Sequence, residues 1–230
     1  MLAAFSVEDG VRGVSFERQQ AYVRRWARSM LRLLRVELEV VGRDEGSAQP
    51  RLVVANHRST LDILIMLDLF GGQLLARNDM ATWPAIGVLA RRAGTLFVDR
   101  DSPASGASAV RTMRERLRRK ITLCVFPEGT TFDGDEVREF RAGSFLAIVR
   151  EHGHVLPVGL AYQEPEAVYG DEPVLDHMKR LVRTPQFRVC AAIGTPRQAD
   201  GADVKTLAQA TRDDVQRLVH RARGHLGGLS

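Results

Sequence analysis

Two residues five positions apart, His57 and Asp62, are the side chains in this sequence best suited to acid–base chemistry. A neutral imidazole accepts a proton near neutral pH, and a carboxylate on its other ring nitrogen fixes the tautomer that does so. On a continuous helix, residues five apart point about 140° away from each other, at ~3.6 residues per turn. The two side chains can therefore meet only if His57 lies before the helix that carries Asp62.

The flanking sequence predicts that arrangement. Residues 51–55, RLVVA, form an apolar run typical of a strand buried on both faces, and His57 follows where this strand would end. Ser59 then offers an N-cap for a helix that begins near Leu61. Ser59 and Asp62 also fit a capping box, in which the carboxylate only satisfies a backbone N–H group. The pair by itself leaves a catalytic and a structural role open.

A second polar cluster follows the buried strand expected over residues 121–126. Glu128 comes next at the strand end, and Gly129, Thr130 and Thr131 form a turn whose N–H groups and hydroxyls can hold a phosphate or a polyol. In open α/β sheets, ligands bind at the carboxyl ends of the strands. Gly-Thr-Thr is also a good turn sequence in its own right, so both roles again stay open.

Composition indicates a soluble globular chain with one core. The 230 residues are 44% hydrophobic and 27% charged, and no run of eighteen apolar residues could span a bilayer. We expect no secretory signal, because the N-terminus lacks a basic region followed by an apolar stretch. Cys124 and Cys190 each lie in a strand-like run, which favours buried free thiols in a reducing compartment over a disulfide.

The positive charge comes mainly from arginine, since only three of the 33 cationic residues are lysine and the net charge is +5. Residues 16–35 have a helical period. One side carries Tyr22, Val23, Trp26, Met30, Leu33 and Leu34, and the other carries Arg18, Arg24, Arg25, Arg28, Arg32 and Arg35. This is the profile of a helix that lies in a membrane interface. The alternative is a surface helix packed on its own domain with a solvated arginine face.

The order of elements predicts the fold class. Strands and helices alternate through the first half, so we expect a single α/β domain with a mostly parallel central sheet flanked by helices, after the N-terminal basic amphipathic helix. The expected strands are 36–41 (at an edge), 51–55, 73–77, 94–100, 121–126, 155–162 (broken by Pro157) and 187–193, and the expected helices include 61–70, a segment ending at 93, 107–120, 140–152, 175–183 and 204–223. The sequence has no dinucleotide fingerprint, Walker loop, Gly-x-Ser-x-Gly elbow or zinc spacing.

Four segments taken together resemble a known family. The order NHRSTLD, GTLFVDR, FPEGTT and VLPVGL resembles the four sequence blocks of the glycerolipid acyltransferases, specifically the lysophosphatidate acyltransferase family, over about residues 35–195. Residues 77–87 are similar to the family segment that precedes the second block. The resemblance implies a tail and membrane-interface helix at 1–35 and an O-acyltransferase domain at 36–230.

The resemblance also implies a chemistry. His57, held by Asp62, acts as general base on the free hydroxyl of a lyso-lipid, most simply lysophosphatidate, which attacks the thioester of acyl-CoA or acyl carrier protein. No cofactor and no metal are implied beyond this acyl donor. Arg77 stands where the family usually has a lysine and is, with a backbone N–H near His57, a candidate oxyanion donor.

The second and third blocks serve the acceptor in this family. The resemblance therefore assigns Arg100 to a phosphate or acidic head, and Glu128, Gly129 and Thr130 to glycerol-like hydroxyls. The family often continues EGTR or EGTS, whereas Thr131 stands at that position here. Phosphate binding then rests on Arg100 and Arg141, or the acceptor is not lysophosphatidate.

Amphiphilic substrates require work at a bilayer surface. We expect a cytoplasmic enzyme, peripheral on the cytoplasmic face of the membrane, whose partners are a lyso-lipid acceptor, an acyl donor and an anionic membrane surface, and not nucleic acid. Three alternatives remain: transfer to another lyso acceptor such as a lyso-ornithine lipid, transfer from a phospholipid donor, or a non-catalytic basic module that binds membrane or nucleic acid.

Overall fold

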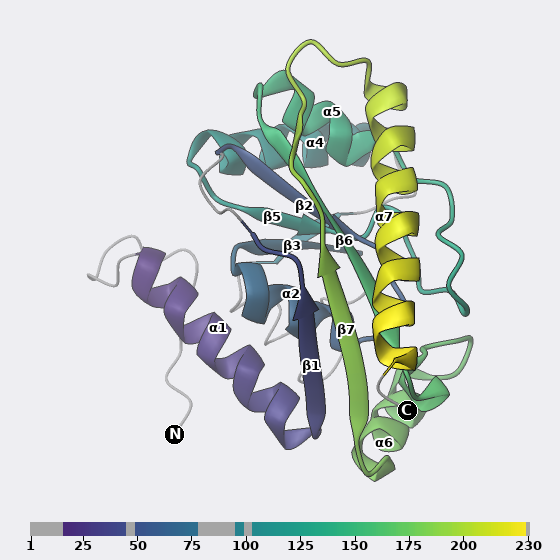
Figure 1. The fold of residues 1–230 in the computed structure, drawn as a ribbon. Coiled ribbons are helices and arrows are strands. Elements are labelled where there is room, and N and C mark those ends of the chain that lie inside the picture. Colours follow the sequence, from purple (N-terminus) through teal and green to yellow (C-terminus); the bar gives the residue numbers. More distant parts are fainter. Residues whose placement is uncertain (1–15, 45–48, 78–94, 99–102, 229–230) are drawn as a thin grey trace.

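The structure is a computed structural model that describes residues 16–44, 49–77, 95–98 and 103–228 (Figure 1). The predicted helical segment that ends at residue 93 lies outside the described residues. The strands are β1 (Val36–Val41), β2 (Arg51–Ala55), β3 (Gln73–Arg77), β4 (Leu96–Val98), β5 (Leu123–Val125), β6 (His154–Tyr162), β7 (Phe187–Ile193) and β8 (Arg197–Gln198). The helices are α1 (Phe16–Leu33), α2 (Leu61–Phe70), α4 (Pro103–Arg118), α5 (Gly143–Arg150), the short 3-10 helix η2 (Pro165–Ala167), α6 (Val174–Arg183) and α7 (Val204–Gly227).

The described strands form one sheet in the order β1-β7-β6-β2-β5-β3-β4, with β8 paired to β6. Strands β2, β5, β3 and β4 run parallel to one another, β6 runs parallel to β2, and β1 runs parallel to β7. Among the strands that the structure describes, only the pairs that join β6 to β7 and to β8 are antiparallel. The predicted single α/β domain with a mostly parallel sheet is thus confirmed, as is the edge position of β1.

Helices cover both faces of the sheet because the central strands are apolar on both sides. On β2, Val53 and Ala55 pack toward α1 and α2, while Leu52 and Val54 pack toward α4, α5 and α7. Figure 1 shows α7, in yellow, lying along β6 and β7 on the face opposite α1 and α2. This sandwich leaves the carboxyl ends of the parallel strands at one edge, where the polar motifs follow β2 and β5.

The prediction that Pro157 breaks its strand is wrong, since β6 is continuous from His154 to Tyr162. Along its side away from β2, β6 pairs with β8 through His154 and Val155, and with β7 from Val158 onward. Pro157 lies between these two ladders, at a point where its missing N–H group interrupts neither.

Several other boundaries differ from those predicted, most of them by one to four residues. Helix α5 begins at Gly143 and not at residue 140, because the backbone N–H of Arg141 donates to the carbonyl of Pro127 before the helix starts. Helix α4 begins at Pro103, whose fixed φ suits the first turn of a helix. The described part of β4 is shorter than the strand expected over residues 94–100.

Helix α1 packs on the domain through a line of small and aliphatic residues. Val23, Ala27, Leu31 and Leu34 are buried against the core beside α2, and Trp26 is half-buried at its margin. Tyr22, by contrast, is exposed. The predicted apolar side is therefore divided into an inner part that packs on the domain and an outer part that faces solvent.

Candidate active site

The register of the parallel strands brings the two polar clusters together. Val54 of β2 pairs with Val125 of β5, so His57 and Glu128, each three residues further on, leave the same edge of the sheet side by side. The side-chain amide of Asn56 fixes the strand end on the other side, since it donates to the carbonyl of Leu160 on β6 and accepts from its N–H group, at 2.9 and 2.8 Å.

His57 and Asp62 meet as the spacing predicts. Nδ1 of His57 lies 2.8 Å from Oδ2 of Asp62, whose side chain has no exposed surface. Because an ionised carboxylate only accepts hydrogen bonds, the imidazole proton sits on Nδ1 and Nε2 carries the lone pair. His57 lies outside α2 and Asp62 lies in its first turn. The geometry is that of a buried carboxylate that fixes the orientation of an imidazole.

The capping function and the dyad use the same carboxylate. Oδ2 of Asp62 also accepts from the backbone N–H groups of Arg58 and Ser59, at 2.6 and 2.8 Å. The N–H of His57 donates to Oε2 of Glu128 at 2.6 Å. Three consecutive N–H groups are thus used to hold the loop, and none of these three is available to a tetrahedral oxyanion.

The imidazole ring of His57 is packed on one face and remains partly exposed. Its ring stacks on Phe126, with centroids 4.2 Å apart and planes 12° apart. About one sixth of the side chain is exposed (17%), and Nε2 has no hydrogen-bond partner among the described residues. Proton abstraction from an incoming hydroxyl requires a base that is held rigidly and is accessible to the substrate. The stacked, partly exposed imidazole meets both conditions.

Tyr162, at the end of β6, completes the environment of Asp62. Its Oη donates to Oδ1 of Asp62 at 2.5 Å, and the residue is buried. Burial first, and then the negative charge of Asp62, raise the pKa of Tyr162 well above its usual value, so the hydroxyl remains a donor. No pattern in the sequence marks this residue, because it is one of several aromatic and apolar side chains in its strand.

Glu128 lies beside His57 as expected, but in a different environment from the one that the resemblance implies. Its side chain has no exposed surface and forms an ion pair with Arg58, whose Nη1 lies 3.0 Å from Oε2. No sequence pattern marks Arg58, since it stands in a polar stretch between His57 and the helix. The charged pair links the loop after β2 to the loop after β5.

The turn over residues 127–130, PEGT, and the residues that follow it lie at the same edge of the sheet. Gly129 has φ of +89°, a conformation that favours glycine, and its N–H donates to the carbonyl of Phe126. Thr131 is half-buried, and Thr130 and Arg141 are exposed. The structure therefore brings Gly129, Thr130, Thr131 and Arg141 to the same strand end as the dyad.

The structure describes the remaining two predicted residues only partly. Arg77 is the last residue of β3, two strands from β2 at the same edge, and its side chain lies outside the described part. Arg100 also lies outside the described residues. One further cation belongs to this region: the N–H of Arg138 donates to Oε1 of Glu128 at 2.9 Å, and its guanidinium lies over the ring of Phe132, 5.4 Å from the centroid.

A buried histidine connects α6 to the loop over residues 56–60, which lies between β2 and α2. Nε2 of His177 lies 3.0 Å from the hydroxyl of Thr60, Nδ1 lies 3.0 Å from a guanidinium nitrogen of Arg180, and the ring stacks on Tyr169. Burial, and then the charge of Arg180, lower the pKa of His177 to about 4. His177 is therefore neutral at physiological pH and donates from Nε2 to Thr60.

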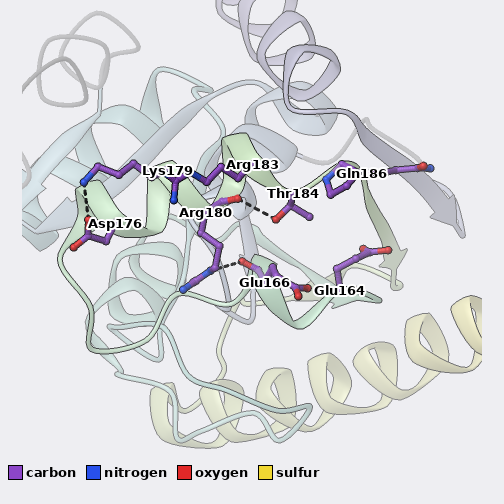
Figure 2. Close-up of a pocket in the computed structure, with 9 residues that line it drawn as sticks. Glu164, Glu166, Asp176, Lys179, Arg180, Arg183, Thr184 and Gln186 are labelled. Atoms are coloured by element: carbon purple, nitrogen blue, oxygen red, sulfur yellow. Dashed lines mark hydrogen bonds and ion pairs between the residues drawn. The ribbon is translucent and has the colours of Figure 1, made fainter.

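A surface pocket of about 640 Å³ lies away from this chemistry (Figure 2). Figure 2 shows Asp176, Lys179, Arg180 and Arg183 lining it from α6, with Glu164 and Glu166 opposite. The Lys179 ammonium pairs with Asp176 at 2.8 Å, and Arg180 donates to the carbonyl of Glu166. Its lining includes neither His57 nor any residue of the PEGT turn, so it is not the catalytic site.

The fold is an α/β domain with a histidine–aspartate dyad at the carboxyl end of its parallel strands, and comparison with known proteins supplies the family. The family model described as Acyltransferase matches residues 37–161. The chain belongs to this acyltransferase family, as the four sequence blocks predict.

Relatives agree with this family assignment, and a solved structure shares the fold. The chain is 35% identical over 205 residues to the lyso-ornithine lipid O-acyltransferase of Pseudomonas aeruginosa, covering 86% of this chain and 78% of that one. It is 30% identical over 155 residues to the 1-acyl-sn-glycerol-3-phosphate acyltransferase of Neisseria meningitidis, covering 67% and 61%. The crystal structure of PlsC, the 1-acyl-sn-glycerophosphate acyltransferase of Thermotoga maritima, shares the fold with a TM-score of 0.72 at 22% identity, covering 93% and 84% of the two chains.

Proposed function

We propose that this protein transfers an acyl group from an acyl thioester, carried by coenzyme A or acyl carrier protein, to the free hydroxyl of a lyso-lipid, with His57 as general base. The observation that carries the proposal is the buried contact of Nδ1 with Asp62, which leaves Nε2 as the free nitrogen of a side chain that is 17% exposed. Membership of the acyltransferase family supports the reaction type.

The geometry supports a single-displacement reaction. Nε2 of His57 takes the proton of the acceptor hydroxyl as its oxygen attacks the thioester carbonyl, and the imidazolium returns that proton to the thiolate as the carbon–sulfur bond breaks. Asp62 stays ionised and stabilises the imidazolium. A positioned base contributes ~10²–10⁴-fold and an oxyanion donor roughly 10²–10³-fold. Because the N–H groups of residues 57–59 bind carboxylates, we assign the oxyanion to Arg77.

For the acceptor, we propose a lyso-ornithine-type lipid ahead of lysophosphatidate. Thr131 stands where phosphate-binding members of the family often have arginine, and lyso-ornithine lipid O-acyltransferases match this chain over most of its length. Lysophosphatidate remains the second candidate because relatives named for that acceptor also match. Arg100 and Arg141 are the cations proposed to bind an acidic head in either case.

We further propose that the outer side of α1 binds an anionic membrane surface together with α6. Five large apolar side chains are exposed in the described part of the chain, and four of them lie on these two helices: Tyr22 and Leu33 on α1, and Leu175 and Val182 on α6. Arg35 joins the helices, since its guanidinium donates to the carbonyls of Val182 and Thr184. Among the described residues, no helix is long and apolar enough to cross a bilayer.

Only part of the arginine side of α1 is proposed to meet lipid headgroups. Arg24 and Arg28 contact the C-terminal end of α2, through its last carbonyls and through Asp68. Arg25 and Arg32 are exposed, and their guanidinium groups have no partner within the described residues. Each such cation contributes ~1 kcal/mol near an anionic surface.

The catalytic proposal is tested with His57→Ala in a product assay on four combinations: lyso-ornithine lipid or lysophosphatidate as acceptor, and acyl-CoA or acyl carrier protein as donor. The wild-type chain should acylate lyso-ornithine lipid with the highest kcat/KM. The variant should lose at least 10³-fold with every pair and keep its binding to vesicles. Transfer at the wild-type rate by His57→Ala would end the proposal.

The membrane proposal is tested by flotation with vesicles of anionic or zwitterionic lipid. The double variant Tyr22→Ser with Leu33→Ser should bind anionic vesicles at least tenfold more weakly than the wild type. Val40→Ser is the matched control, because Val40 is exposed on β1 and not on either helix. Equal binding by the double variant and the control would place the lipid-binding surface elsewhere.

A further inference from the structure

The carboxylate of Glu128 is fully used within the protein. Oε2 accepts from the N–H of His57 at 2.6 Å, and Oε1 accepts from the N–H of Arg138 at 2.9 Å. Nη1 of Arg58 lies within 3.1 Å of both oxygens. A carboxylate has about four acceptor positions, and these contacts occupy them.

Arg58 is equally well satisfied. Its side chain is buried, and beyond Glu128 it donates to the carbonyls of His57, Gly134 and Glu136, at 2.8, 2.6 and 2.7 Å. A buried ion pair is tolerated only when the remaining donors and acceptors of both groups are also paired. The pair therefore joins the backbone of the histidine loop to the loop over residues 134–138 as one hydrogen-bonded unit.

We propose that Glu128 is a positioning residue, which together with Arg58 sets the backbone of His57, and that it does not bind the acceptor. The proposal rests on the proposed function of His57. A hydroxyl of the acceptor could reach the carboxylate only by displacing a backbone donor, and the side chain offers no exposed surface to approach. Thr130, exposed on the same turn, is the residue of this block that an acceptor hydroxyl can contact.

The two roles differ in what a substitution changes. Glu128→Gln replaces one acceptor oxygen with an NH₂ group. Because this group is a donor and its neighbours, a backbone N–H or the Arg58 guanidinium, are donors too, the loop that carries His57 must shift. A displacement of about 1 Å at a catalytic group can cost about 10²-fold in rate. We expect kcat to fall about 10²-fold while the dissociation constant of the acceptor stays within about twofold.

The experiment compares Glu128→Gln with Thr130→Val, a matched change two residues away. The dissociation constant of lyso-ornithine lipid in mixed micelles is measured with each change combined with His57→Ala, so that no turnover occurs. Thr130→Val should raise the dissociation constant of the acceptor at least tenfold, whereas Glu128→Gln should leave that constant within about twofold and lower kcat about 10²-fold. A tenfold or larger rise in the dissociation constant with Glu128→Gln overturns the proposal.

Two further measurements support the comparison: an NMR signal of His57, and a double variant for the case in which Glu128→Gln does not fold. The NMR resonance of the His57 Nδ1 proton should move or broaden in Glu128→Gln and stay in place in Thr130→Val. If Glu128→Gln does not fold, Arg58→Met with Glu128→Leu removes both buried charges. That pair should fold with low kcat and normal acceptor binding, whereas wild-type kcat overturns the proposal. Failure of the proposed function is recognised separately, because His57→Ala alone would then remain active.

Discussion

Replacement of Tyr162 by phenylalanine tests how the buried acid of the dyad is held. The change removes one hydroxyl and keeps the ring, so the packing at the end of β6 is preserved. Oδ1 of Asp62 then has no donor within the described part of the chain, and the side chain has no exposed surface through which water could replace the hydroxyl. The perturbation is therefore the loss of a single hydrogen bond to a buried charge.

The size of the effect follows from that contact. A hydrogen bond to a charged group contributes about 1.5–3 kcal/mol, which for a chain of this length lowers Tm by roughly 3–12 °C. Oδ2 keeps its contacts with Nδ1 of His57 and with two backbone N–H groups. We therefore expect kcat to fall about tenfold, which corresponds to ~1.4 kcal/mol in the activation free energy. This is much less than the ~10⁴-fold loss that follows when a triad carboxylate is replaced by an amide.

The assay is urea unfolding combined with steady-state acyl transfer, with Tyr22→Phe as the control because it removes the hydroxyl of an exposed tyrosine. The control should change stability by less than about 0.5 kcal/mol. The wild-type rate should also show no alkaline limb from tyrosine ionisation, since the pKa of Tyr162 is raised well above its usual value. If Tyr162→Phe matches the wild type in both stability and kcat, the reasoning about this hydrogen bond is refuted.

Three further predictions concern stability and thiol chemistry. The pKa of His177 is lowered to about 4, so the unfolded chain binds its proton more readily than the folded chain does. About 3 kcal/mol of stability should therefore be lost as pH falls from about 6.5 to 4, and this loss should be absent from the stability–pH curve of His177→Gln. Burial raises the pKa of Cys124 to about 12 and that of Cys190 to about 11, so at pH 8 both thiols should react with a disulfide reagent only after unfolding. A Cβ at Gly159 would lie 2.3 Å from backbone atoms of α7, so Gly159→Ala should cost about 3 kcal/mol or more in urea unfolding, whereas Gly224→Ala, with open space around it, should be neutral or stabilising.

The features that the sequence predicts correctly depend on local patterns. The strand at residues 51–55 and the helix that starts near Leu61 are marked by apolar periodicity and by turn residues, and together they place His57 and Asp62 correctly. The strand end before Glu128 is marked in the same way. Both free, buried cysteines also follow from their apolar strands.

The features that could not be predicted depend on tertiary contacts. Nothing near Arg58 indicates that its partner is Glu128, 70 residues away, or that Tyr162 reaches Asp62 across 100 residues. The resemblance places Glu128 at the right edge of the sheet, but a sequence block does not show whether a carboxylate faces the substrate or the backbone. Helical periodicity likewise gives α1 one broad apolar side and does not show that Tyr22 is left in solvent.

The long sequence separations within the catalytic site have a consequence for how activity appears during refolding. The amide of Asn56 is fixed by a residue 104 positions later, and the backbone of His57 by one 71 positions later. Contacts this distant in the chain close slowly, because the intervening segments must be ordered first. Recovery of acyl transfer after dilution from urea should therefore coincide with the last kinetic phase, which makes enzymatic turnover a reporter of the completed native state.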